Sequence, residues 1–154
     1  AKSWRNGEKM ISESRIRVRY AETDRMGIVY HANYLVWFEI ARSEFLEKLG
    51  FPYEEMEKAG YMSPVADVQL SYGMPLTYGD TAIVRTRVTK LTPAKTVYSY
   101  EVYKDGQAVG VDKPCCTGSS THCLVSAESF KPVNQKRIMP ELYAAYLEAL
   151  EADE

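Results

Sequence analysis

The chain has 154 residues, with 19 basic and 21 acidic side chains and a formal net charge of -2. This length suits one domain with a sizeable core, so we predict a single domain over residues 1–154. The balanced charge excludes a global positive field, so nucleic acid is not an expected partner. No run of about 18 apolar residues occurs, so we expect no transmembrane segment.

The cysteines and histidines argue against a disulfide-rich protein and against a metalloprotein. Cys115, Cys116 and Cys123 form an odd set without CxxC spacing, which fits a reducing compartment better than a disulfide framework. The polar N-terminal stretch lacks the apolar centre of a signal peptide. We therefore expect a cytoplasmic protein. The two histidines, His31 and His122, lie far apart and have no ligand-spaced cysteines, so no metal site is predicted.

The first predicted elements are a strand and a long helix. After an expected N-terminal extension at residues 1–13, apolar and arginine residues alternate from Arg15 to Tyr20, the period of a half-buried strand. Residues 33–50 have apolar side chains at helical spacing, and Gly50 is a natural stop. The apolar stripe is so wide that we expect the helix to be covered on several sides.

Four strands and a terminal helix complete the predicted order. Alternating patterns indicate strands between residues 65 and 126, with a strong hairpin signal at Asp105-Gly106. Residues 136–154 are predicted as a C-terminal region with a short amphipathic helix. The order predicts an α+β fold in which a mostly antiparallel, curled sheet wraps around one long central helix.

The loop before the helix, YAETDRMGIVYHANY, is dense in functional residue types. A thioester needs a nucleophile at its carbonyl carbon and donors for the developing oxyanion, whereas the thiolate leaves with little acid help. Asp24 precedes the helix closely, and the first amides of a helix are unsatisfied donors at the positive end of its dipole. The carboxylate could attack the carbonyl or activate water, and the sequence leaves both routes open.

The same loop resembles the 4-hydroxybenzoyl-CoA thioesterase-like branch of the hotdog superfamily, which includes bacterial short-chain and aromatic acyl-CoA thioesterases. The resemblance rests on Tyr20, Thr23-Asp24, Met26-Gly27, Val29-Tyr30-His31 and Asn33-Tyr34, and extends over roughly residues 14–130. It implies an acyl-CoA thioesterase without a cofactor, with coenzyme A only as part of the substrate and product. The segment from Asp112 to Gly118 departs from the family pattern.

The resemblance also implies roles for individual residues. Asp24, His31 and Tyr20 are the predicted catalytic residues, with the backbone N–H of His31 as the oxyanion donor. The predicted substrate-binding residues are Gly27, Ile28, Val29, Tyr30, Asn33, Tyr34 and Tyr72. Lys90 and Lys95 are expected to bind the phosphates of coenzyme A. Hotdog relatives pair their sheets with the sites at the interface, so a homo-oligomer, a dimer or a tetramer, is expected.

Simpler interpretations stay open for several of these residues. Asp24 alone is typical of a helix cap or turn, and Tyr20 could be a core tyrosine. Lys90 and Lys95 could be solvated at the end of a hairpin. The alternative functions are an acyl-acyl carrier protein thioesterase and a protein that binds acyl thioesters without hydrolysing them.

Overall fold

The computed structural model describes residues 10–152, so the first nine residues of the predicted extension lie outside the described part of the chain. Its strands are β1 (Ser12–Arg17), β2 (Tyr61–Met62), β3 (Val65–Tyr72), β4 (Thr81–Leu91), β5 (Thr96–Lys104), β6 (Cys116–His122) and β7 (Val125–Ser126). Its helices are the 3-10 turn η1 (Tyr20–Glu22), α1 (Asn33–Leu49), α2 (Tyr53–Lys58), α3 (Gln135–Ile138) and α4 (Pro140–Ala152).

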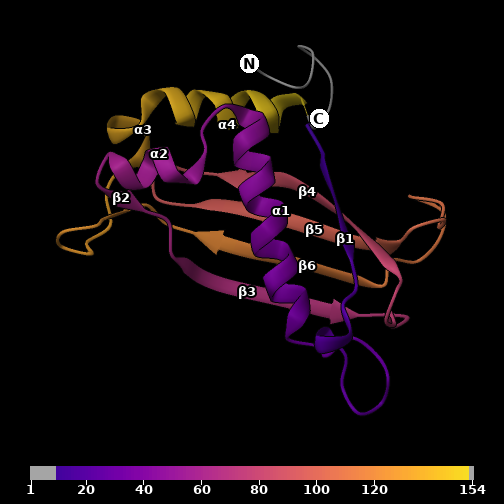
Figure 1. Cartoon of the computed structure of the whole chain (residues 1–154). Helices are drawn as coiled ribbons and strands as arrows, with labels where there is room; N and C mark the ends of the chain where they lie inside the picture. Colours follow the sequence, from indigo (N-terminus) through magenta and orange to yellow (C-terminus); the bar gives the residue numbers. More distant parts are fainter. Residues whose placement is uncertain (1–9, 153–154) are drawn as a thin grey trace.

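One antiparallel sheet forms the frame of the molecule. Its five strands lie in the order β1-β4-β5-β6-β3, so β3 is an edge strand. Figure 1 shows α1 crossing one face of this sheet, with α4 at the end away from η1. β2 and β7 pair in a separate two-stranded sheet. None of the helices in the described part of the chain is long and apolar enough to cross a membrane.

The core lies between α1 and the sheet. Trp37, Phe38, Ala41 and Phe45, at helical spacing, are at most 2% exposed. The ring of Phe38 stacks on that of Tyr100 in β5, with a centroid distance of 4.2 Å and an interplanar angle of 5°. Gly118 in β6 makes room for this ring, because an added Cβ would lie 2.6 Å from Cε2 of Phe38.

The first strand starts earlier and ends sooner than its apolar pattern indicates. Ser12 and Ser14 are buried, and each hydroxyl has a partner on α1: Lys48 Nζ donates to Ser12 Oγ at 2.8 Å, and Ser14 Oγ donates to Glu44 Oε2 at 2.5 Å. These polar pairs between β1 and α1 satisfy buried groups that hydropathy patterns do not reveal. The predicted strand was wrong at its end, because the chain turns into η1 and leaves Tyr20 exposed.

An apolar surface runs along β3 and the neighbouring side of α1. Its exposed residues are Leu35, Val36 and Ile40 of α1 and Val65 and Val68 of β3. Part of it lines a hollow of about 230 Å³ between the two elements. The wide apolar stripe of α1 is therefore covered by the sheet on one side and left open beside the edge strand β3.

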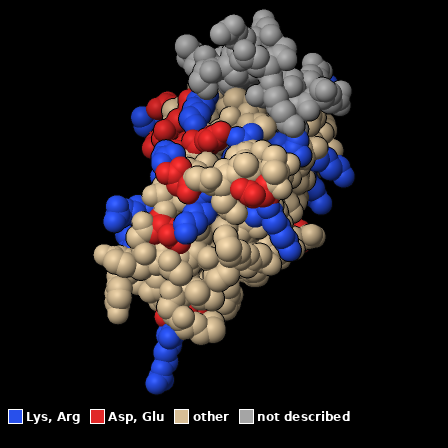
Figure 2. Space-filling view, turned by 90° about the vertical axis from the view of Figure 1, so that its right-hand side faces the viewer, with Lys and Arg blue, Asp and Glu red and all other residues tan. Residues whose placement is uncertain are grey.

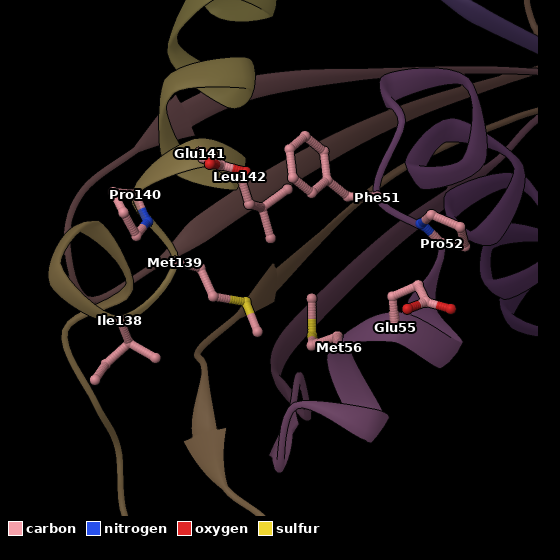
Figure 3. Close-up of a pocket in the computed structure, with 9 residues that line it drawn as sticks. All are labelled: Phe51, Pro52, Glu55, Met56, Ile138, Met139, Pro140, Glu141 and Leu142. Carbon is pink, nitrogen blue, oxygen red and sulfur yellow. The ribbon is translucent and has the colours of Figure 1, made fainter. Parts of the chain in front are cut away.

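A second apolar hollow lies at the C-terminal end of α1. Figure 3 shows Met56, Met139 and Leu142 converging on a groove of about 340 Å³ between α2 and the α3–α4 corner. The 17 residues of α1 separate this groove from the loop that precedes the helix. That length corresponds to about 25 Å. The groove is thus remote from the predicted catalytic loop.

Candidate active site

The predicted catalytic loop is a short hairpin that leads into α1. Thr23 pairs with Val29, the N–H of Asp24 donates to Ile28 O at 2.9 Å, and the N–H of Gly27 donates to Asp24 O at 2.9 Å. Gly27 has φ +81°, the left-handed conformation that a three-residue hairpin with a bulge requires. The glycine therefore fixes the backbone turn that carries Asp24.

Asp24 uses one of its two carboxylate oxygens in this turn. Its Oδ1 accepts a 2.9 Å hydrogen bond from the N–H of Met26, the pattern of an Asx turn. Within residues 10–152 no donor reaches its Oδ2. The turn interpretation of Asp24 is thus correct for one oxygen, and the other remains accessible to a substrate or a water molecule.

The start of α1 offers hydrogen-bond donors beside this hairpin. The N-cap residue, Ala32, provides no side-chain cap, and in the described part of the chain the N–H groups of His31 and Ala32 have no acceptor. Unsatisfied amides at a helix N-terminus carry its partial positive charge and favour an anion. This geometry can stabilise negative charge on an oxygen atom.

Aromatic side chains surround the helix start. The rings of Tyr30 and His31 lie 4.4 Å apart, and His31 meets the edge of Tyr72 at 6.2 Å. Tyr34 is buried and packs against Tyr72 at 5.6 Å. The structure therefore brings four of the predicted site residues together from α1, its preceding loop and the end of β3.

Cys116 belongs to the same aromatic environment and was not predicted. It pairs with Tyr72 across the β3–β6 ladder and is fully buried. Burial raises the pKa of Cys116 to about 12, so this thiol is not a nucleophile at neutral pH. Burial also raises the pKa of Tyr34 to about 12, which keeps its hydroxyl protonated. Both side chains therefore stay protonated at neutral pH.

Tyr20 lies on the outside of the hairpin. It is 77% exposed and its ring meets the edge of Tyr78 at 5.7 Å, so the interpretation as a core tyrosine is wrong. Met26 is also exposed. On the face that Figure 2 shows, the lower end of the molecule is mostly uncharged, apart from one projecting basic side chain and a little acidic surface.

A second loop, residues 73–80, supports the hairpin and was missed as part of the site. The N–H of Val29 donates to Leu76 O at 2.9 Å, and Ile28 forms a bridge with Thr77. Asp80 holds this loop by accepting from the N–H of Thr77 at 2.8 Å, and that bond is the main cause of a lowered Asp80 pKa. Ile28 and Val29 thus have structural contacts on this side.

The predicted coenzyme A lysines lie far from the hairpin within the chain. β4 begins beside the site, since the N–H of Val18 donates to Asp80 O at 2.8 Å, but Lys90 lies near its other end. The 11 residues of β4 span roughly 35 Å in extended form. Lys95 lies across the same turn, next to α3. Their role stays a prediction.

His122 and Cys123 do not form a second reactive centre. His122 is 1% exposed, its Nε2 lies 2.8 Å from Ser120 Oγ, and burial lowers its pKa to about 4. Neighbouring side chains on a strand point to opposite faces. Within residues 10–152 no group of three His, Cys, Asp or Glu side chains is arranged to hold a metal ion.

A curled antiparallel sheet around one apolar helix, with a carboxylate hairpin at the uncapped helix start, is the architecture of a hotdog-fold protein. A family model described as the thioesterase-like superfamily matches residues 18–145. The chain belongs to this family, which confirms both the predicted fold and the predicted class of thioester hydrolase.

Individual relatives agree with this assignment. The chain is 45% identical over 139 residues to YneP of Bacillus subtilis (strain 168), to which acyl-CoA thioesterase activity is attributed, covering 90% of this chain and 97% of YneP. The structure of DHNA-CoA thioesterase from Staphylococcus aureus is similar with a TM-score of 0.85 and 37% identity, over 92% of this chain and 91% of that one. A hypothetical protein from Thermus thermophilus has a TM-score of 0.77 and 33% identity, over 90% and 96% respectively.

Proposed function

We propose that the protein hydrolyses acyl-CoA to a free carboxylic acid and coenzyme A, with Asp24 as the carboxylate that drives the reaction. One observation carries this proposal: the hairpin presents a carboxylate oxygen without a protein donor next to a helix start with two free N–H groups. The first group can supply electrons to a thioester carbonyl, and the second can bind the oxyanion that results.

Two routes use this arrangement. In one, Asp24 Oδ2 attacks the carbonyl carbon, the C–S bond breaks, and water then hydrolyses the mixed anhydride. In the other, Asp24 removes a proton from water, and the hydroxide attacks the carbonyl before the thiolate leaves. Both consume one water and release the acid and the thiol. The N–H of His31 is the proposed oxyanion donor in each case.

The other predicted residues have supporting roles in this proposal. The imidazole of His31 orients the carboxylate or the water, and Tyr20 lines the approach to the hairpin. The acyl group lies against Gly27, Ile28, Val29, Tyr30, Asn33, Tyr34 and Tyr72. No cofactor is required, because coenzyme A enters with the substrate. The location that we propose for this activity is the cytoplasm.

We also propose that the active form is a homo-oligomer built on β3. This edge strand leaves backbone groups open on one side, and Val65, Val68, Leu35, Val36 and Ile40 extend the same surface as exposed apolar residues. Open edges of this kind favour pairing with another strand. A second copy can pair its own β3 antiparallel with this one, and two such dimers can form a tetramer.

The experiment is steady-state hydrolysis of a panel of acyl-CoAs by the wild type and Asp24→Asn, with detection of the free thiol. Asp24→Asn keeps the side-chain size and the bond to Met26, so substrate binding should persist while turnover falls by about a hundredfold to ten-thousandfold. His31→Ala should cost less, because its backbone N–H survives. Turnover of Asp24→Asn within about threefold of wild type would remove Asp24 from the mechanism.

The same panel separates the proposal from its alternatives. Faster turnover of acyl groups on acyl carrier protein than on coenzyme A would change the donor and leave the mechanism in place. Binding of a non-hydrolysable acyl-CoA analogue without any hydrolysis by the wild type would indicate a binding protein.

A further inference from the structure

Glu22 is a buried carboxylate at the base of the catalytic hairpin. It is 5% exposed, and its Oε2 accepts a 2.7 Å hydrogen bond from Nε1 of Trp37, on the second turn of α1. Its Oε1 accepts from the backbone N–H of Arg19 at 2.9 Å, and the Arg19 guanidinium lies 3.3 Å away. The side chain therefore joins the start of η1 to the helix.

The backbone of Glu22 makes the same connection a second time. Its carbonyl accepts from the N–H of Tyr30 and from Nδ2 of Asn33, both at 2.8 Å. The first bond closes the hairpin two residues before Asp24, and the second holds it to the first residue of α1. Glu22 thus connects the hairpin strand that leads to Asp24 with Tyr30 and Asn33, the residues on either side of His31.

The carboxylate of Glu22 is unsuited to act as a base. Burial tends to raise its pKa, but the donors from Arg19 and Trp37 outweigh this, so its pKa lies below the ordinary value. Both oxygens already accept hydrogen bonds. A buried carboxylate with these partners is ionised at neutral pH and has little access to substrate.

We propose that Glu22 is the positioning residue of the site: it fixes the Asp24 carboxylate relative to the free amides at the start of α1. This inference rests on the proposed thioesterase function. Displacement of a reacting group by about 1 Å can cost about a hundredfold in rate. Loss of the hydrogen bonds of Glu22 should therefore displace Asp24 and lower turnover, while the residues that bind the rest of the substrate are unchanged.

The principal variant is Glu22→Gln, which keeps the side-chain shape. An amide has only one acceptor oxygen, so its NH₂ must face the N–H of either Arg19 or Trp37. We expect kcat to fall about tenfold to a hundredfold with KM for acyl-CoA changed less than about threefold. Trp37→Phe removes one donor, and the double variant should lose less than the product of the two single losses.

Glu44→Gln is the matched control. It alters a different hydrogen-bonded carboxylate, which lies on α1 and accepts from Ser14 in β1, without touching the hairpin. Its kcat should equal that of the wild type even if its melting temperature falls. Hydrogen exchange gives a readout that does not need activity: backbone protection in residues 20–33 should fall in Glu22→Gln and not in Glu44→Gln.

The outcomes separate this inference from the function on which it rests. If the wild type hydrolyses no acyl-CoA, the proposed function fails, and exchange of residues 20–33 still decides whether Glu22 holds the hairpin. A folded Glu22→Gln variant with kcat within about twofold of wild type overturns the inference. If Glu22→Gln does not fold, an unchanged kcat in Trp37→Phe overturns the inference instead.

Discussion

The hydroxyl of Tyr72 donates a 3.0 Å hydrogen bond to the backbone carbonyl of His31. Tyr72 is the last residue of the edge strand β3, and His31 lies just before α1. The bond therefore ties the peptide that follows His31 to the sheet, next to the free N–H groups of the helix start. Loss of this bond would therefore act on the orientation of those N–H groups.

Tyr72→Phe should lower kcat by roughly threefold to tenfold with a small change in stability. The variant removes one hydrogen bond of a half-exposed side chain, and such a bond contributes about 1 kcal/mol. Its loss frees the His31–Ala32 peptide, which adjoins the Tyr30–His31 peptide that carries the proposed oxyanion donor. Steady-state kinetics and thermal unfolding check this expectation. Tyr143→Phe in α4 is the control, and equal rates for both variants would show that the bond has no catalytic role.

Val68→Lys should abolish the proposed oligomer and leave a folded monomer. Val68 is 38% exposed on the edge strand, so a lysine there can reach solvent in the isolated subunit but opposes strand pairing. Sedimentation at working concentrations measures the effect. Val111→Lys, at a site that is 84% exposed, is the control. A wild type that sediments only as a fully active monomer would contradict the proposed assembly.

Neutralising Lys90 and Lys95 together should raise KM for acyl-CoA and leave kcat nearly unchanged, since remote phosphate anchoring is mostly uniform binding. Both lysines lie at the far end of β4 and β5 from the hairpin of their own subunit. An effect would therefore imply that a neighbouring subunit supplies them. Wild-type KM values for Lys90→Gln/Lys95→Gln at low salt would indicate a solvated turn.

The stability of the fold should fall in mild acid because of His122. Its pKa is lowered from 6.5 to about 4, mainly by burial and further by Arg42, so the unfolded chain binds a proton that the folded protein excludes. Stability is thus complete above about pH 6.5 and declines as the pH falls toward about 4, with a loss of about 2 kcal/mol by pH 5.

Urea unfolding of the wild type and His122→Gln over this pH range measures the contribution of the histidine. The free energy of unfolding is plotted against pH for each protein. The difference between the two slopes gives the contribution of His122, because the other titrating groups are common to both proteins. Parallel slopes would show that His122 gains access to protons without unfolding.

The elements with a strong apolar period were predictable from the sequence. The helix at residues 33–49 and the strands β4 and β5 follow their patterns, because one face of each packs into the core. The short elements α2, β2, β7 and α3 were not predicted. Between two and six residues long, they are too short to establish a period.

The candidate site was predictable in its residue types but not in its internal bonds. Asp24 and His31 stand out because their loop is dense in functional groups. Glu22 lies in the same loop, but its hydrogen bonds were not predictable, because its partner Trp37 is fifteen positions away and buried carboxylates have no pattern of their own. The support from residues 73–80 was also missed, since the contacts between these two loops are made by backbone groups.

The positions of α1 and β3, on which the proposed catalytic geometry depends, require a glycine at position 118. A Cβ at this position would meet both the Phe38 ring and the carbonyl of Gln69 in β3, at 2.6 and 2.7 Å. Any replacement must push α1 away from the sheet or loosen the edge strand, the two elements that meet at Tyr72 and His31. Random mutagenesis scored for lost turnover should therefore recover Gly118 among its inactive but folded variants, although this residue contacts none of the proposed reacting groups.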